Sequence, residues 1–164
     1  MKYNKFYLLI IAMIINFSAY SQVSVTGTAY TEIVPLATVK EMVQFNAGRF
    51  SVVSDGGSIT ITPEGTRLAK GSVILLDGPF SQGGFSISGS ENNSLSIILP
   101  NTPQFLYHTN SVSSIYLDKW TYNIPMIRNS NTMINIGATL HFKSIEANPA
   151  GIYTGKYQII FFYN

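Results

Sequence analysis

Apolar and polar residues alternate in short runs along most of the chain after residue 22. The longest run sets apolar side chains on one face, and its apolar members are Ile134, Ile136, Ala138, Leu140 and Phe142. Shorter runs with the same period lie at 23–29, 58–62, 85–88 and 95–99. A period of two is that of a β-strand with one buried face, whereas this part of the chain shows no convincing helical period of 3.6 residues. The pattern predicts an all-β protein.

Turn-forming residues separate these runs. Asp55-Gly56-Gly57 has the composition of a hairpin turn, and Pro63-Glu64-Gly65 that of a turn in which proline sets φ. Residues 73–76 are apolar on both faces, as in a central strand, and residues 39–42 fit a strand or a single helical turn. Strands that recur about every ten residues favour an immunoglobulin-like antiparallel β-sandwich of about seven to nine strands. Because neither a linker nor a repeat interrupts residues 22–164, we expect them to form a single domain.

The first 21 residues are typical of an export signal. Lys2 and Lys5 accompany an apolar run that is about 12 residues long, too short to cross a hydrocarbon core of about 30 Å. Ala19 and Ser21 are small residues at the −3 and −1 positions of a cleavage site before Gln22. We therefore expect a signal peptide over residues 1–21 and no membrane span after its removal. The mature chain is expected in the periplasm, at the cell surface or outside the cell.

Removal of the signal peptide changes the charge of the chain. Lys2 and Lys5 are two of its ten basic residues, so eight basic and eight acidic residues remain in residues 22–164. A formally neutral mature chain gives no reason to expect binding to nucleic acid or to anionic membranes. The chain has no cysteine, which excludes thiol catalysis, zinc–cysteine sites and iron–sulfur clusters.

The sequence shows no catalytic or metal-binding constellation. Its two histidines, His108 and His141, have no metal-ligand spacing, and His141 falls on the polar face of its run, where a solvated side chain is expected. The acidic residues stand singly, mostly beside turns, and no calcium loop occurs. A Gly-x-Ser-x-Gly elbow and a phosphate-binding glycine loop are also missing from the sequence. We expect a protein that is not an enzyme and that holds no metal or cofactor.

Six segments, in this order, resemble one family of exported bacterial domains, the domain of unknown function 4402. They are residues 45–50, 57–67, 71–76, 85–89, 136–140 and 150–157. The second resembles the family's G-x-V-x-I-x-P-x-G-x-R hairpin, and the last resembles its closing A-G-x-Y-x-G-x-[FY] strand. The resemblance runs from about residue 34 to the C-terminus, with a poor match over 104–128. It implies an exported domain and brings no established activity.

A looser similarity is to the pilin subunits of chaperone–usher systems. Those immunoglobulin-like domains lack one strand, and a partner's N-terminal strand fills the gap. This chain also ends in an alternating strand, with a glycine fourteenth from the end; the members of this hypothetical assembly strand are Gly151, Tyr157, Ile159, Phe161 and Tyr163. The similarity implies a pilin-like sandwich and a donor strand formed by Val23, Val25, Gly27 and Ala29. The same residues also fit the ordinary last and first strands of a self-complete domain.

Aromatic residues make up 13% of the chain and offer a second interpretation. Four of them, Tyr107, Tyr116, Trp120 and Tyr122, are close in sequence and fit either a ligand surface or places in the core. Two functions therefore stay open. The first is a non-catalytic structural or adhesive subunit (surface, matrix or fimbria-like) that associates with itself or with another protein by β-strand addition. The second is a monomeric extracellular module that binds carbohydrate, or an envelope or host protein, through exposed aromatics.

Overall fold

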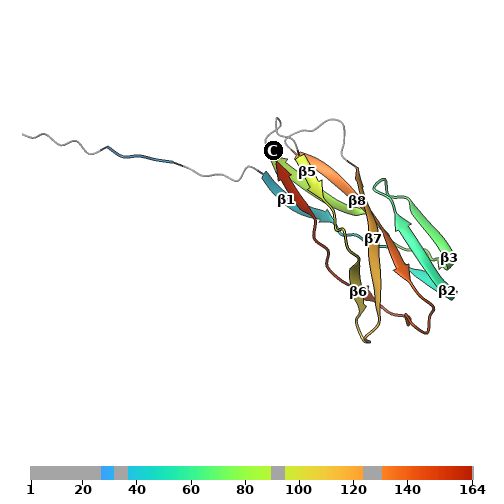
Figure 1. Ribbon diagram of the computed structural model, residues 1–164. Coiled ribbons are helices and arrows are strands. Elements are labelled where there is room, and N and C mark those ends of the chain that lie inside the picture. The colour runs from blue at the N-terminus through green and yellow to red at the C-terminus, as the bar shows by residue number, and fades with distance from the viewer. Residues whose placement is uncertain (1–26, 32–36, 90–94, 124–130, 164) are drawn as a thin grey trace, which may run out of the picture. The chain divides into compact units, whose positions relative to one another are not determined.

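The computed structural model describes residues 27–31, 37–89, 95–123 and 131–163. The chain divides into two units, Met1–Ile33 and Val34–Asn164. In the first unit the described residues, 27–31, are exposed and form no strand. In the second unit every regular element that is described is a β-strand (Figure 1).

Ten strands make up the described part of the second unit, and their pairings are antiparallel. They are β1 (Ala37–Val43), β2 (Phe50–Ile61), β3 (Arg67–Leu75), β4 (Gly83–Gly89), β5 (Leu95–Ile98), β6 (Gln104–His108), β7 (Ser114–Asn123), β8 (Asn131–Phe142), β9 (Tyr153–Thr154) and β10 (Ile160–Tyr163). The predicted all-β, antiparallel, sandwich-like fold is confirmed. The strands exceed the expected seven to nine because the C-terminal stretch is divided into the short strands β9 and β10.

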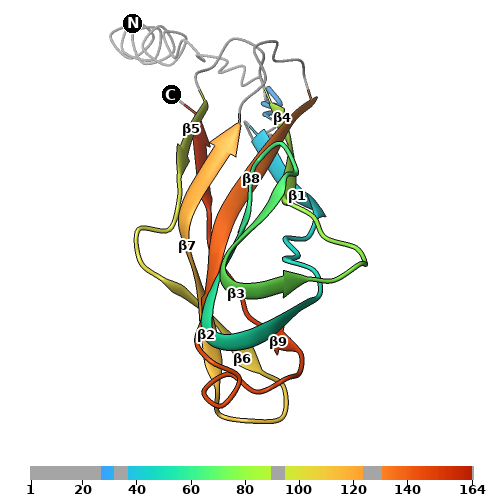
Figure 2. The ribbon, with the colours of Figure 1, turned by 90° about the vertical axis from the view of Figure 1, so that its right-hand side faces the viewer.

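Strand β8 lies at the centre of the main sheet. Along one edge it pairs with β7. Along the other edge its first half pairs with β4 and its second half with β2, as Figure 2 shows. The sheet therefore divides at β8, with β1 beside β4 on one branch and β3 beside β2 on the other. Strands β5 and β10 form a separate two-stranded sheet.

The core is built from the apolar residues of the alternating runs. The apolar members of the longest run, from Ile134 to Phe142, are all buried, and Ile59 and Ile61 of β2 are fully buried opposite the second half of β8. Each large apolar side chain that leaves water in this way contributes about 1.5–3 kcal/mol to folding. The period-two pattern thus selects the residues that hold the sheet branches together.

The structure corrects the hairpin expected at Asp55-Gly56-Gly57. These residues lie inside β2, because the chain on both sides of them pairs with the same strand, β3. The register shifts between Val52 and Gly57, and Gly56 has a φ of +84°. A glycine with positive φ inside a paired strand is typical of a β-bulge, which uses the same residues as a tight turn. The turn at Pro63-Glu64-Gly65 is confirmed, with the Gly65 amide donating to the Thr62 carbonyl at 2.9 Å.

Two further local predictions are settled by the strand order. Among the described residues β3 pairs only with β2, and the side chain of Ile74 is 54% exposed. The prediction of a central strand at 73–76 is therefore wrong: Val73 packs against the core, and its apolar neighbours lie at an edge of the sheet. Residues 39–42, for which a helical turn was the alternative, form part of strand β1.

Candidate functional site

The C-terminal segment 153–163 forms one wall of the candidate site. Its two ends are paired, β9 with β6 and β10 with β5, while residues 155–159 between them belong to no strand. Side chains alternate along it: Tyr157, Ile159 and Phe161 pack against the core, and the residues between them are exposed. This inward face contains three of the residues expected in the assembly strand. For a fourth, Tyr163, the structure describes only the backbone pairing with Leu95.

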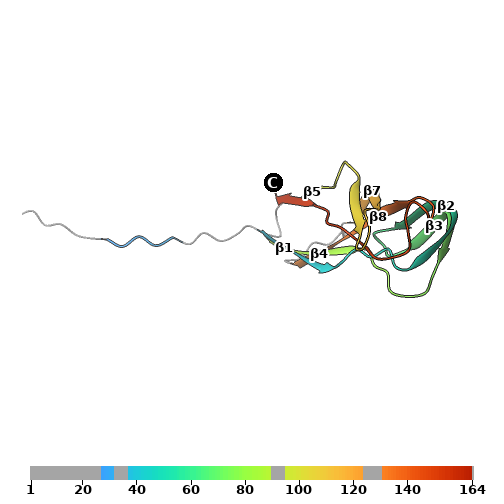
Figure 3. The ribbon, with the colours of Figure 1, turned by 90° about the horizontal axis from the view of Figure 1, so that it is seen from below.

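Strand β1 and the residues that follow it form the opposite wall. Among the described residues, β1 pairs with β4 along one edge and has no partner along the other. Figure 3 shows β1 with β4, and β10 with β5, as separate pairs of strands. After β1 the chain is held by reciprocal backbone hydrogen bonds of 2.9 Å between Asn46 and Ser81, and then enters β2. Each wall therefore includes backbone that pairs with no strand among the described residues. In one wall this is the second edge of β1, and in the other it is residues 155–159.

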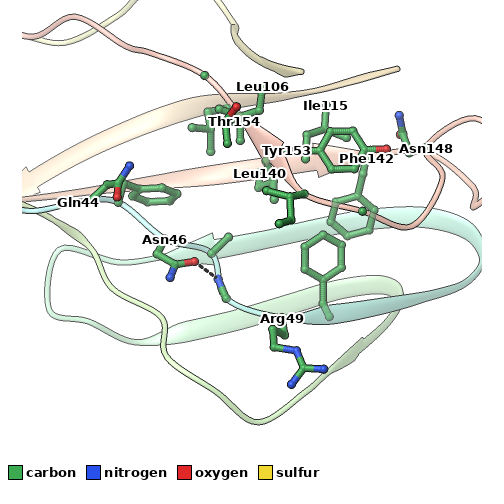
Figure 4. A pocket seen from close by; sticks show the side chains of 18 of the residues that line it. Gln44, Asn46, Arg49, Leu106, Ile115, Leu140, Phe142, Asn148, Tyr153 and Thr154 are labelled. Atoms are coloured by element: carbon green, nitrogen blue, oxygen red, sulfur yellow. Dashed lines mark hydrogen bonds between the residues drawn. The ribbon is translucent and has the colours of Figure 1, made fainter. Parts of the chain in front are cut away.

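An apolar groove of about 1200 Å³ lies between these walls. Its floor is made of core side chains, among them Leu106, Ile115, Leu140 and Phe142 (Figure 4). A smaller depression of about 410 Å³, between β1 and residues 158–161, continues it. Several large side chains beside the groove are only partly buried: Phe45, Phe50, Phe85, Tyr153, Tyr157 and Ile159. Among the described residues, the core is thus left uncovered between the unpaired edge of β1 and residues 155–159.

A side-chain hydrogen bond joins the two walls. The Tyr157 hydroxyl donates to Glu41 Oε1 at 3.4 Å, and the Tyr157 ring packs on Trp120 with centroids 4.8 Å apart. Burial, and after it the negative charge of Glu41, raises the pKa of Tyr157 far above its usual range, so the hydroxyl stays protonated and remains a donor. Glu41, Phe85 and Ile159 line both the groove and the smaller depression. The Glu41–Tyr157 hydrogen bond, called the Glu41–Tyr157 bridge from here on, therefore lies where the groove and the smaller depression meet.

His108 contacts the chain just before the C-terminal wall, at Ala150 and Gly151. The Asn110 amide donates to His108 Nδ1 at 2.9 Å, and His108 Nε2 lies 3.2 Å from the Ala150 carbonyl. This geometry fits a neutral imidazole that carries its proton on Nε2. A Cβ added to Gly151 would lie 2.0 Å from Nε2, so any larger residue there would have to displace the His108 ring. The sequence predicts Gly151 in an assembly strand or in an ordinary last strand, and it does not indicate the histidine beside it.

The aromatic residues proposed as a ligand surface are not brought together. Trp120 is 9% exposed and packs between Phe45 and Tyr157, so it belongs to the core and must be removed from that surface. Tyr107 is 60% exposed and lies opposite Ser114, whereas Tyr122 lies eight positions further along β7, about 26 Å away. The predicted cluster therefore contains two separate exposed tyrosines and one buried tryptophan.

The fourth aromatic residue, Tyr116, takes part in a different arrangement. Its ring stacks on His141, with centroids 4.9 Å apart and planes at 13°. His141 Nε2 lies 2.8 Å from Asp118 Oδ1, and the histidine side chain is 23% exposed. The His141 side chain, expected to be solvated, is therefore only partly exposed, since β7 places an aromatic ring and a carboxylate beside it. Among the described residues no group of three or more histidine, aspartate or glutamate side chains could hold a metal ion.

Half of the proposed donor strand lies outside the described residues. This applies to Val23 and Val25, whereas Gly27 and Ala29 are described and exposed. In the part of the chain that the structure describes, no helix is long and apolar enough to span a membrane.

A comparison with family models gives one match. The model described as a domain of unknown function, number 4402, matches residues 37–163, so the resemblance to this family is confirmed. No curated protein and no solved structure matches the chain. The similarity to pilin subunits is thus not confirmed.

Proposed function

Starting from the fact that the chain belongs to the family of the domain of unknown function 4402, we propose that it is a non-catalytic, exported structural or adhesive subunit that assembles by β-strand addition. The observation that carries the proposal is the apolar groove between β1 and the C-terminal segment 153–163. An extended segment of a protein partner would lie in this groove and complete the sheet.

Strand edges and an apolar floor are the two features that such binding needs. An unpaired edge presents a row of backbone N–H and C=O groups to another chain. Main-chain hydrogen bonds then supply affinity, and pockets for alternate side chains supply specificity. Here the unpaired backbone of residues 155–159 runs beside the floor that contains Leu106, Leu140 and Phe142. Every second side chain of an added strand would leave water on this floor.

The polar side chains around the groove favour a structural role. Asn148 Oδ1 accepts from the Lys143 amide at 2.6 Å, and its amide nitrogen donates to the Ser114 carbonyl at 2.9 Å. Glu41 accepts from Tyr157. These groups are engaged in holding the walls of the groove, so the proposal assigns no catalytic role to them. The predicted signal peptide and the low share of charged residues, 11%, support a place in the periplasm, at the cell surface or outside the cell.

A second candidate function uses the outer face of β6. Phe105 and Tyr107 are 47% and 60% exposed there, and their ring centroids are 6.5 Å apart. Adjacent exposed aromatics of this kind can bind a carbohydrate or a protein surface. The flat face of Tyr116 next to them is covered by His141, which leaves only two rings for a ligand. The groove offers more, because it combines apolar area with unpaired backbone.

An unheated denaturing gel of the protein sheared from the cell surface tests the proposed function. We expect a ladder of bands that collapses to one band on boiling, because subunits joined by an added strand dissociate slowly. Ala47→Trp, which places a large ring in the groove, should remove the ladder. The matched control is Ala69→Trp, which adds the same bulk on the edge strand β3, outside the groove, and should keep the ladder. A different result would favour the binding module. The unaltered protein would give a single band both unheated and boiled, and a Phe105→Ser/Tyr107→Ser variant would lose binding to a carbohydrate or a protein surface.

A further inference from the structure

Tyr157 lies at the middle of residues 155–159, the stretch of the C-terminal wall that belongs to no strand. Its ring packs on Trp120 of β7, and the Glu41–Tyr157 bridge ties its hydroxyl to β1. On β4, a Cβ at Gly83 would lie only 3.0 Å from the same hydroxyl oxygen, so the glycine leaves room for it. Three strands thus form a niche around one side chain, which we call the Tyr157 niche.

A β-bulge turns Trp120 into this niche. The register of β7 against β8 shifts between Asp118 and Thr121, where β7 has one residue more than β8. In an unbroken strand Trp120 would share the face of Asp118, but the extra residue changes the parity, and the indole is buried in the core. Lys119, just before it, has a φ of +49° and is the one non-glycine residue with a positive φ in the described part of the chain. A bulge re-aims a side chain, and backbone strain of this kind persists where the surrounding structure imposes it.

A second bulge lies beside Glu41. The register of β1 against β4 shifts between Glu41 and Val43, with Met42 as the extra residue. In addition, the Trp120 indole nitrogen has no hydrogen-bond partner among the described residues, so no hydrogen bond of its own holds the ring in place. Both bulges interrupt a ladder, and a buried donor without a partner costs free energy. That these features meet at one tyrosine indicates a purpose for the niche beyond packing.

We infer that Tyr157 is the anchor of the strand-addition site: seated in its niche, it holds residues 155–159 in place beside the groove before a partner binds. The inference rests on the proposed function and names a positioning residue for it. A segment that is held by its side chains keeps backbone N–H and C=O groups free for an added strand. A wall that is fixed beforehand also loses less conformational entropy when the partner arrives. The niche therefore makes the groove a preformed site.

Tyr157→Ala, compared in the band ladder of protein sheared from the cell surface, tests this inference. The variant empties the niche, so the wall should lose its fixed position and the fraction of protein in the ladder should fall about tenfold or more. Tyr157→Phe keeps a ring against Trp120 and should assemble to within about threefold of the unaltered chain. Ile61→Ala is the control, because it truncates a fully buried side chain that does not line the groove; it should lower Tm by a comparable amount and keep the ladder.

Trypsin cleavage after Lys156 measures the position of the wall directly in the purified mature chain. Lys156 is exposed and lies next to Tyr157 in the unpaired stretch. Tyr157→Ala should be cut there about ten times faster than the unaltered chain, because the wall opens locally. Tyr157→Phe and Ile61→Ala should be cut at the rate of the unaltered chain at a temperature where circular dichroism shows them folded.

The outcomes separate this inference from the proposed function. If Tyr157→Ala keeps the ladder, or if Ile61→Ala loses it to the same extent, Tyr157 is an ordinary core residue, and the inference is overturned while the proposed function stands. If Tyr157→Phe fails as fully as Tyr157→Ala, the ring in its niche does not position the wall, and the inference is overturned as well. If the unaltered protein gives no ladder, the proposed function fails, and cleavage after Lys156 still decides whether Tyr157 holds the wall.

Discussion

A mature chain that carries a second copy of residues 22–31, which contain the predicted donor strand, after its C-terminus and joined by a short flexible linker, should be monomeric and more heat-stable than the unaltered monomer. The added segment would fill the groove of its own subunit, because the C-terminal strand β10 ends beside β5 at one end of the same wall. A short linker holds the segment at an effective concentration in the millimolar range. At about one hundred times the dissociation constant, binding to the native state adds about 2.7 kcal/mol to the free energy of unfolding. For a domain of this size this raises Tm by about 5 to 10 °C.

Differential scanning calorimetry and light scattering measure the two parts of this result. The control carries the same ten residues in scrambled order after the same linker, so that composition and length are unchanged. It should melt with the unaltered monomer and still form oligomers through its original N-terminal segment. If the scrambled segment stabilised the chain equally, general hydrophobic contact would explain the effect, and a specific strand site would be refuted.

Gly137→Ala should lower the free energy of unfolding by about 1–3 kcal/mol, and Tm by about 3 to 10 °C. Gly137 lies in the middle of β8, where an added Cβ would be 2.5 Å from the Ile61 carbonyl oxygen and 2.8 Å from Pro63 Cδ. The backbone around Ile61 cannot retreat easily, because Ile61 pairs with Ala138 and Thr62 is held by Thr66 in the next turn. The methyl group therefore has to displace paired backbone.

Urea unfolding followed by tryptophan fluorescence measures this loss, since Trp120 lies in the core. Ala69→Val is the control, because it adds methyl groups at an exposed position of the edge strand β3, and its effect should stay within about 0.5 kcal/mol. Equal stabilities for Gly137→Ala and the unaltered chain would show that β8 and the turn after β2 are less tightly packed than the contacts indicate.

The alternation of apolar residues predicted the strands and the core well, because side-chain period alone decides which face of a strand is buried. The structure buries the apolar residues from Ile134 to Phe142, as this pattern indicated. It also packs Tyr157, Ile159 and Phe161 against the core. Strand order is a different matter, because it depends on partners far away in the sequence. Residues 73–76 were therefore assigned to the centre of a sheet although β3 lies at its edge among the described strands.

Local composition also could not distinguish features that use the same residues. Asp55-Gly56-Gly57 suits a tight turn and a β-bulge equally, and only the pairing of both flanks with β3 decides for the bulge. The groove could not be predicted in full for a similar reason. Its C-terminal wall follows from the alternation, but the Glu41–Tyr157 bridge and the contact of His108 with Gly151 join residues that are far apart in sequence.

Amide hydrogen exchange at residues 155–159 tests the central claim, that a strand is added along this wall, most directly. These residues belong to no strand in the described part of the chain, so their amides should exchange quickly in the monomeric fraction. In oligomers of the unaltered chain an added strand would pair with them and slow their exchange about a hundredfold or more. Oligomers in which residues 155–159 exchange as fast as in the monomer would show that the subunits are joined at another surface, which contradicts assembly through the groove.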